Sequence, residues 1–128
     1  MTRQQFARYL EALKAHDYET FKQYYSEDYR AYFDGGVFDR DQVVEVERSL
    51  ATIAETNLDI LQVVLDAEGA VIHAILELHF MKDAPPGFAM GPRKAGERAK
   101  ARFCGFYKLR GDEICEFRVF QFLGETLE

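Results

Sequence analysis

Two ionisable side chains, Glu77 and His79, stand two residues apart on one predicted strand and could perform acid–base chemistry. A carboxylate beside an imidazole helps the ring to take up a proton near neutral pH. Alternation along the strand, however, puts both on the face opposite Leu76, Leu78 and Phe80. We therefore favour a structural role for the pair, on a face that meets water or a second subunit.

Tyrosine hydroxyls are a second set of groups that could take part in binding or catalysis. Tyr9, Tyr25, Tyr29 and Tyr107 could donate hydrogen bonds to a ligand oxygen, as in sites that stabilise an oxyanion. The alternative is that each tyrosine fills the core and its hydroxyl finds a local partner. Both interpretations stay open for Tyr9, and the structural one is favoured for the other three.

Asp34 is the candidate general base. A site that abstracts a proton in an apolar cavity needs a base and a donor for the developing oxyanion, both within reach of one substrate. Asp34 ends a short predicted strand, and Tyr9 shares a helix face with Phe6 and Leu13. The competing interpretation, which we favour, is that Asp34 only starts an Asp-Gly-Gly turn.

Other site chemistry has little support in the sequence. Cys104 and Cys115 form neither a Cys-x-x-Cys pair nor a zinc spacing, and no histidine is placed to activate a thiol. The histidines show no chelating spacing, and no glycine-rich phosphate loop is present. His16 is interpreted as a favourable charge at a helix C-terminus. We expect no metal and no cofactor.

Length and charge limit the partners. The 128 residues suit a single domain, 1–128, with one hydrophobic core. A net charge of −6 disfavours nucleic acid. The basic residues from Arg93 to Arg102 are interpreted as a solvated loop and strand edge, with binding of an anionic substrate group as the alternative. No apolar run is long enough to span a bilayer, and the first residues lead straight into an amphipathic helix. We expect no signal peptide, no membrane partner and a cytoplasmic location.

Hydrophobic periodicity predicts the elements that must position these side chains. Thr2 and Gln5 suggest a capping box for a first helix, and Asp39 or Asp41 caps a third. Helices are predicted over 3–15, from Asp17 to Tyr25, and over about 41–55; strands are predicted over 29–33, 58–65, 70–81, 99–109 and 113–123. Hairpin-length connections imply antiparallel pairing. The predicted fold class is α+β, a cone in which three N-terminal helices pack on a strongly curved antiparallel sheet and enclose an apolar pocket.

Three stretches of the chain resemble the nuclear transport factor 2-like superfamily, and within it the SnoaL-like polyketide cyclases and ketosteroid isomerases. They are residues 8–17, 24–28 and 111–118. The resemblance implies an isomerase- or cyclase-type enzyme that needs no cofactor and acts on a hydrophobic carbonyl or polycyclic compound. The alternative is a non-catalytic, dimeric ligand-binding or protein-interaction module. By this resemblance Tyr9 and Asp34 would be catalytic, while the acids of the cyclases' last strands have no counterpart between Phe117 and Phe122.

The resemblance also implies which residues face a small hydrophobic ligand. We expect the pocket to be lined by Leu13, Tyr25, Phe33, Leu76, Leu78, Phe103, Tyr107, Phe117, Val119 and Gln121. This choice takes the register in which Ala101, Phe103, Gly105 and Tyr107 face inward, and a slip of one residue would replace them.

Two further surfaces are assigned from the predicted elements. The loop between residues 83 and 92 is long for a compact domain and is predicted to form a lid, with Phe88 and Met90 closing over a ligand. The outer sheet face mixes apolar and polar residues, as interfaces do, and is predicted to form a homodimer. Its residues on the longest strand are His73, Ile75, Glu77 and His79.

Overall fold

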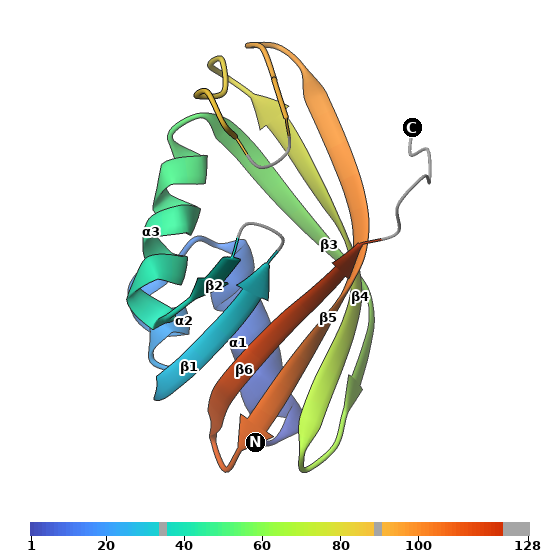
Figure 1. Cartoon of the computed structure of the whole chain (residues 1–128). Helices are drawn as coiled ribbons and strands as arrows, with labels where there is room; N and C mark the ends of the chain where they lie inside the picture. The colour runs from blue at the N-terminus through green and yellow to red at the C-terminus, as the bar shows by residue number, and fades with distance from the viewer. Residues whose placement is uncertain (34–35, 89–90, 122–128) are drawn as a thin grey trace.

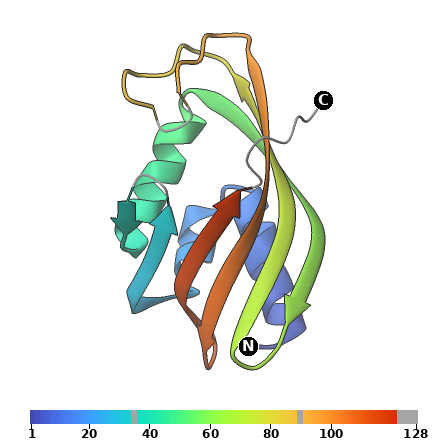
Figure 2. The same cartoon turned by 45° about the vertical axis from the view of Figure 1, so that its right-hand side comes forward.

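The computed structural model describes residues 1–33, 36–88 and 91–121 (Figure 1). Its elements are α1 (Arg3–Lys14), α2 (Tyr18–Lys22), β1 (Tyr25–Phe33), β2 (Gly36–Phe38), α3 (Arg40–Ala51), β3 (Ala54–Leu65), β4 (Gly69–Phe80), β5 (Arg98–Arg110) and β6 (Glu113–Gln121). The described strands form one six-stranded sheet in the order β2-β1-β6-β5-β4-β3. Figures 1 and 2 show the three helices on the concave side of this bent sheet, which confirms the predicted α+β cone.

The two long helices begin where the sequence predicts. The Thr2 hydroxyl accepts a hydrogen bond from the Gln5 backbone, and the Gln5 side chain accepts one from the Thr2 backbone. Asp39 and Gln42 make the same reciprocal pair at the start of α3, so Asp39 and not Asp41 is the cap. Each box satisfies two backbone donors that a helix start leaves free.

The second helix is shorter than predicted. It ends at Lys22, and the expectation that it extends through Tyr24 and Tyr25 is wrong, because Tyr25 already begins β1. The Tyr24 carbonyl accepts a hydrogen bond from the Ile114 backbone at 2.7 Å, which starts the pairing of β1 with β6. So short a helix has little stability of its own, and pairing with a distant strand ends it.

The sheet is mostly antiparallel, with one parallel pair. Strands β3 to β6 pair with their sequence neighbours, as their short connections predict, except that a longer loop joins β4 to β5. The β1 strand runs parallel to β6, and the short edge strand β2 was not predicted from the sequence. The connection from β1 to β6 crosses most of the chain, so no local pattern indicates its direction.

The register of β5 is the one that the sequence favours. Ala101, Phe103 and Tyr107 face the helices, and Lys108 pairs with Glu116 on the other face. A bulge follows, because Leu109 then pairs with Ile114 and leaves Cys115 as the extra residue. The thiol of Cys115 lies 3.5 Å from the Lys108 carbonyl oxygen and does not line the cavity.

Two hydrophobic clusters fill the space between helices and sheet. The larger one joins α1, α2 and α3 to the middle of the sheet and includes Phe6, Tyr9 and Phe21. The smaller one consists of Ala54, Leu78 and Phe80 with partly buried neighbours near the β4–β5 loop. No helix in the described part of the chain is long and apolar enough to cross a membrane.

Candidate functional site

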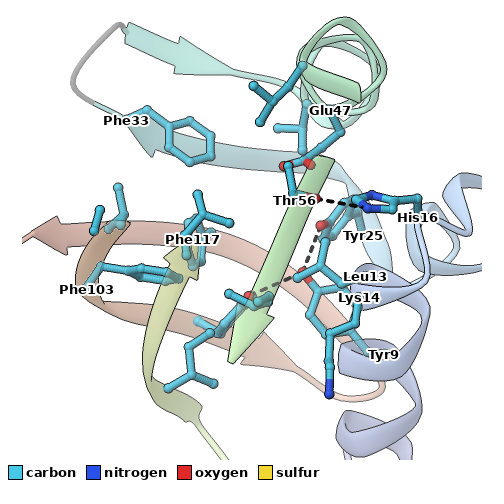
Figure 3. A pocket seen from close by; sticks show the side chains of 18 of the residues that line it. Tyr9, Leu13, Lys14, His16, Tyr25, Phe33, Glu47, Thr56, Phe103 and Phe117 are labelled. Atoms are coloured by element: carbon cyan, nitrogen blue, oxygen red, sulfur yellow. Dashed lines mark hydrogen bonds between the residues drawn. The ribbon is translucent and has the colours of Figure 1, made fainter. Parts of the chain in front are cut away.

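A cavity of about 220 Å³ lies inside the larger cluster, between α1, α3 and the concave face of the sheet (Figure 3). The predicted pocket residues that line it, together with Tyr9, are Leu13, Tyr25, Phe33, Leu76, Phe103, Tyr107, Phe117, Val119 and Gln121. They come from α1 and from four strands, and alternation along each strand brings them to one side. The lining is mainly aromatic and aliphatic, so the cavity suits an apolar ligand.

Some predicted site residues lie elsewhere. Leu78 does not line the cavity but packs in the smaller cluster, since β4 continues past the end of the cavity. Phe88 packs edge-on against Phe80, with ring centroids 5.9 Å apart, and belongs to the same cluster and not to the cavity wall. Asp34 and Met90 lie outside the described residues, so their predicted roles as base and lid stay predictions.

A network of tyrosine hydroxyls lies on one side of the cavity. The Tyr9 and Tyr25 hydroxyl oxygens are 2.8 Å apart, and the Tyr9 hydroxyl donates to that of Tyr107 at 3.4 Å. The Tyr29 ring stacks on the Tyr25 ring at 4.0 Å between centroids. Burial raises the pKa of all four hydroxyls, mainly because the charged form would lose its hydration. They are therefore neutral near pH 7 and keep their protons.

These hydroxyls have one proton more than their mutual hydrogen bonds require. Three hydroxyls, those of Tyr9, Tyr25 and Tyr107, carry one proton each, and two hydrogen bonds join them. If Tyr9 donates to Tyr107, then Tyr25 donates to Tyr9, and the Tyr107 proton stays available. Within the described residues no hydrogen bond from the Tyr107 hydroxyl to a further acceptor is seen, so a ligand oxygen could accept this proton.

Glu47 is a cavity residue that sequence analysis missed. It extends from α3 into the cavity, on the side away from Tyr9 (Figure 3). Burial raises the pKa of its carboxyl, and no hydrogen bond or ion pair within the described residues holds it. The available signal was its spacing: Glu47 falls between Val43 and Leu50 on the apolar stripe of the third helix, where a carboxylate is out of place.

His16 joins the cavity wall through an unusual backbone. It follows α1 with a φ of 58°, in the left-handed region that glycine usually occupies after a helix. Backbone hydrogen bonds from His16 to Leu13 and from Asp17 to Ala12 close the helix end. The imidazole Nε2 lies 2.9 Å from the Thr56 hydroxyl of β3. His16 thus links α1 to the sheet, beyond the helix-terminal charge that the sequence indicated.

The other candidate chemistry stays outside the cavity. Glu77 pairs with Arg98 at 3.7 Å, and neither Glu77 nor His79 lines the cavity. Both cysteines are free thiols that are absent from its lining. Within residues 1–33, 36–88 and 91–121, no group of three or more His, Cys, Asp or Glu side chains could hold a metal ion. The polar groups that line the cavity are tyrosine and Thr56 hydroxyls, the Glu47 carboxyl, the His16 imidazole, the Lys14 ammonium and the Gln121 amide.

Solved structures from several bacteria share this fold. A protein assigned as a polyketide cyclase from a Silicibacter species superposes with a TM-score of 0.78 and 18% identity, over 94% of this chain and 88% of that chain. A second such protein, from Pseudomonas putida, superposes with a TM-score of 0.77 and 17% identity, over 93% of this chain and 90% of that chain. A third protein, from Catenulispora acidiphila, has a ketosteroid isomerase-like fold and is in complex with trimethylamine. It superposes with a TM-score of 0.72 and 14% identity, over 96% of this chain and 88% of that chain.

Sequence comparison gives the family. No curated protein matches the chain. The sequence model of the SnoaL-like domain, in contrast, matches residues 6–117, which run from α1 to the middle of β6 and contain most of the cavity lining. The chain therefore belongs to the SnoaL-like domain family.

Proposed function

We propose that this protein binds a compact, mainly apolar molecule with one oxygen function in the cone cavity. The observation that carries the proposal is the available hydroxyl proton of the Tyr9, Tyr25 and Tyr107 network, which adjoins an otherwise apolar wall. Ligand sites of this kind combine many apolar contacts with a few placed polar groups that fix orientation.

The size of the cavity favours a small ligand over a polycyclic one. Its volume of about 220 Å³ is below the roughly 300–1,000 Å³ of pockets for drug-sized ligands. The Catenulispora protein is in complex with trimethylamine, which is a small molecule without fused rings. A single ring with a short substituent suits the volume better than the fused rings of a polyketide.

Isomerase- or cyclase-type acid–base catalysis is a second candidate. The observation that favours it is the buried Tyr9 hydroxyl at the centre of the network, since a neutral donor there would stabilise an enolate oxygen. Such a reaction also needs a base, and Asp34 remains the one proposed for it. Without a base the cavity would serve a non-catalytic binding module.

A cavity-filling variant tests the binding proposal. Cyclohexyl methyl ketone serves as the neutral probe, and its affinity is measured by NMR titration. Val119→Trp places a large ring in the cavity, and Val46→Trp places the same ring on the exposed face of α3 as a control. We expect saturable binding in the wild type and in Val46→Trp, and none in a folded Val119→Trp. Equal binding by all three proteins would contradict the proposal.

We also propose a homodimer through the outer sheet face and a cytoplasmic location. His73, Ile75, Glu77 and His79 are each half-buried on β4, beside the exposed Val64 of β3. Mixed apolar and polar surfaces of this kind are typical of subunit interfaces. Light scattering should give the mass of a dimer at high micromolar concentration, and a monomer there would count against this assembly.

A further inference from the structure

The carboxyl of Glu47 is not explained by the binding of an apolar ligand. It lines the cavity, its pKa is raised by burial, and no side chain or backbone group in the described structure bonds to it. Glu47 is half-buried, and an acidic group that loses part of its hydration without gaining a partner costs free energy that an apolar residue would save. The neighbouring Val43 and Leu50 on the same face of α3 show that an apolar residue would fit there.

The cations that line the cavity are already engaged elsewhere. Lys14 is exposed, and its ammonium lies 3.8 Å from Glu11 on the outside of α1. The His16 imidazole is bonded to Thr56. The remaining titratable groups of the wall are the tyrosines, whose raised pKa values keep them neutral. Among the described residues no cation forms an ion pair with Glu47.

The rest of the wall suits a positive charge. Aromatic side chains surround the space from several elements: Tyr9, Tyr25, Tyr29, Phe33, Phe103 and Tyr107. The faces of such rings carry partial negative charge and attract ammonium groups, most strongly where water is excluded. A carboxylate next to aromatic faces provides both charge compensation and apolar contact for an alkylammonium ion.

We propose that the cavity selects a small organic amine in its ammonium form, with Glu47 as the counter-ion and the aromatic wall around its alkyl groups. This inference rests on the proposed function, since it names the ligand class of the same cavity. The tyrosine hydroxyl proton would then orient an oxygen elsewhere on the amine.

Proton release gives the proposal a specific signature. An alkylammonium ion, with a pKa of about 10, stays charged throughout the neutral range. In the empty cavity burial raises the pKa of Glu47, so below that raised pKa the carboxyl is protonated. Binding of the ammonium converts that carboxyl to a carboxylate and releases its proton to the buffer. Affinity for the amine therefore rises with pH until Glu47 is ionised in the free protein.

The experiment compares N,N-dimethylcyclohexylamine with the near-isosteric cyclohexyl methyl ketone by calorimetry between pH 5 and 8. At each pH the titration is done in two effective buffers that differ in ionisation enthalpy and that are not alkylamines. The variants are Glu47→Gln and the control Glu45→Gln, which alters an exposed carboxyl on the same helix. Because Glu47→Gln keeps Lys14, His16 and the tyrosines, its difference from the wild type isolates the Glu47 carboxyl.

We expect Glu47→Gln to weaken amine binding by roughly tenfold or more, the size of a hydrogen bond to a charged group, and to leave ketone binding unchanged. Wild type and Glu45→Gln should release up to one proton with the amine and none with the ketone. This release is measured in the wild type, so it decides the proposal even if Glu47→Gln does not fold.

Two results separate failure of this inference from failure of the proposed function. In the first, the wild type binds the ketone, but it binds the amine no more tightly than Glu47→Gln does, or it binds the amine without releasing a proton at any pH tested. The cavity is then a ligand site but not an amine site. If neither molecule binds the wild type, the proposed function fails and the amine inference fails with it.

Discussion

The two hydrophobic clusters of this protein differ in what they contain. The smaller one, around Leu78 and Phe80 near the β4–β5 loop, is entirely apolar, and both side chains are fully buried. The larger one contains tyrosine hydroxyls, the Glu47 carboxyl and a cavity of about 220 Å³. Empty space and buried polar groups both reduce stability. The comparison indicates that the larger cluster is the less stably packed of the two, as the proposed ligand site requires.

The largest expected effect comes from emptying the smaller cluster. Phe80→Ala removes a fully buried ring that packs against Phe88, and should lower the free energy of unfolding by about 3–5 kcal/mol. Phe103→Ala removes a half-buried ring beside existing empty space and should cost clearly less. Urea unfolding measures both. Equal losses would mean that the cavity wall is packed as tightly as the smaller cluster.

Gly105→Ala tests how closely the wall is packed behind the cavity. A Cβ there would lie 2.6 Å from the Phe117 ring and 3.2 Å from Ile72. The ring must therefore shift, and we expect a loss of about 1–3 kcal/mol in unfolding free energy. The displaced ring should also weaken ketone binding in the NMR titration. Unchanged stability together with unchanged binding would show that the wall is loosely packed.

Tyr9→Phe tests the tyrosine network without changing the apolar packing. It removes the hydroxyl that joins Tyr25 to Tyr107, at a cost of about 0.5–1.5 kcal/mol per hydrogen bond. The effect should appear in both unfolding free energy and ketone affinity. Tyr32→Phe is the control, since its half-buried ring lies under Arg118 and outside the cavity. Equal effects of the two variants would argue against a special role for the network.

The pH dependence of stability tests the cost of Glu47. Burial raises its pKa in the folded protein, so its contribution to stability is most favourable below the ordinary carboxyl pKa and falls as pH rises through the raised folded value. Glu47→Gln removes this dependence, and its melting temperature relative to wild type should rise between pH 4 and pH 8. Glu45→Gln should show no such trend. A constant difference across this range would contradict the burial of the carboxyl.

The smallest effect is expected at an exposed ion pair outside both clusters. Hydrogen bonds from Arg110 lower the pKa of the Asp28 carboxyl in the folded protein. The pair therefore stabilises the fold at pH values above the ordinary carboxyl pKa, and this stabilisation is lost as pH falls through the lowered pKa. Both groups are exposed, and solvent screens their interaction. Asp28→Asn should therefore change the melting temperature only slightly at neutral pH. A loss comparable to that of Gly105→Ala would mean that the pair anchors the β1–β6 junction.

Local sequence was sufficient for most of the fold. The capping boxes of Thr2 with Gln5 and of Asp39 with Gln42 involve residues three apart, so the sequence contains both partners. Alternation along β5 likewise identified Phe103 and Tyr107 as inward-facing, whereas Val119 of β6 was expected there from the family resemblance. In each of these cases the interaction depends on neighbours along the chain or on a short turn.

Tertiary structure decided the direction of β1, the end of α2 at Lys22, and the chemistry of the cavity. The hydroxyls of Tyr9 and Tyr107 meet across 98 positions of sequence, and His16 reaches Thr56 across 40. No periodicity records such contacts. Glu47 was visible as a charge on an apolar stripe, but only the fold shows that it faces an aromatic cavity and has no ion pair with any described residue. The chain thus determined its elements locally, whereas the burial that gives its polar groups their properties arises only when distant elements pack together.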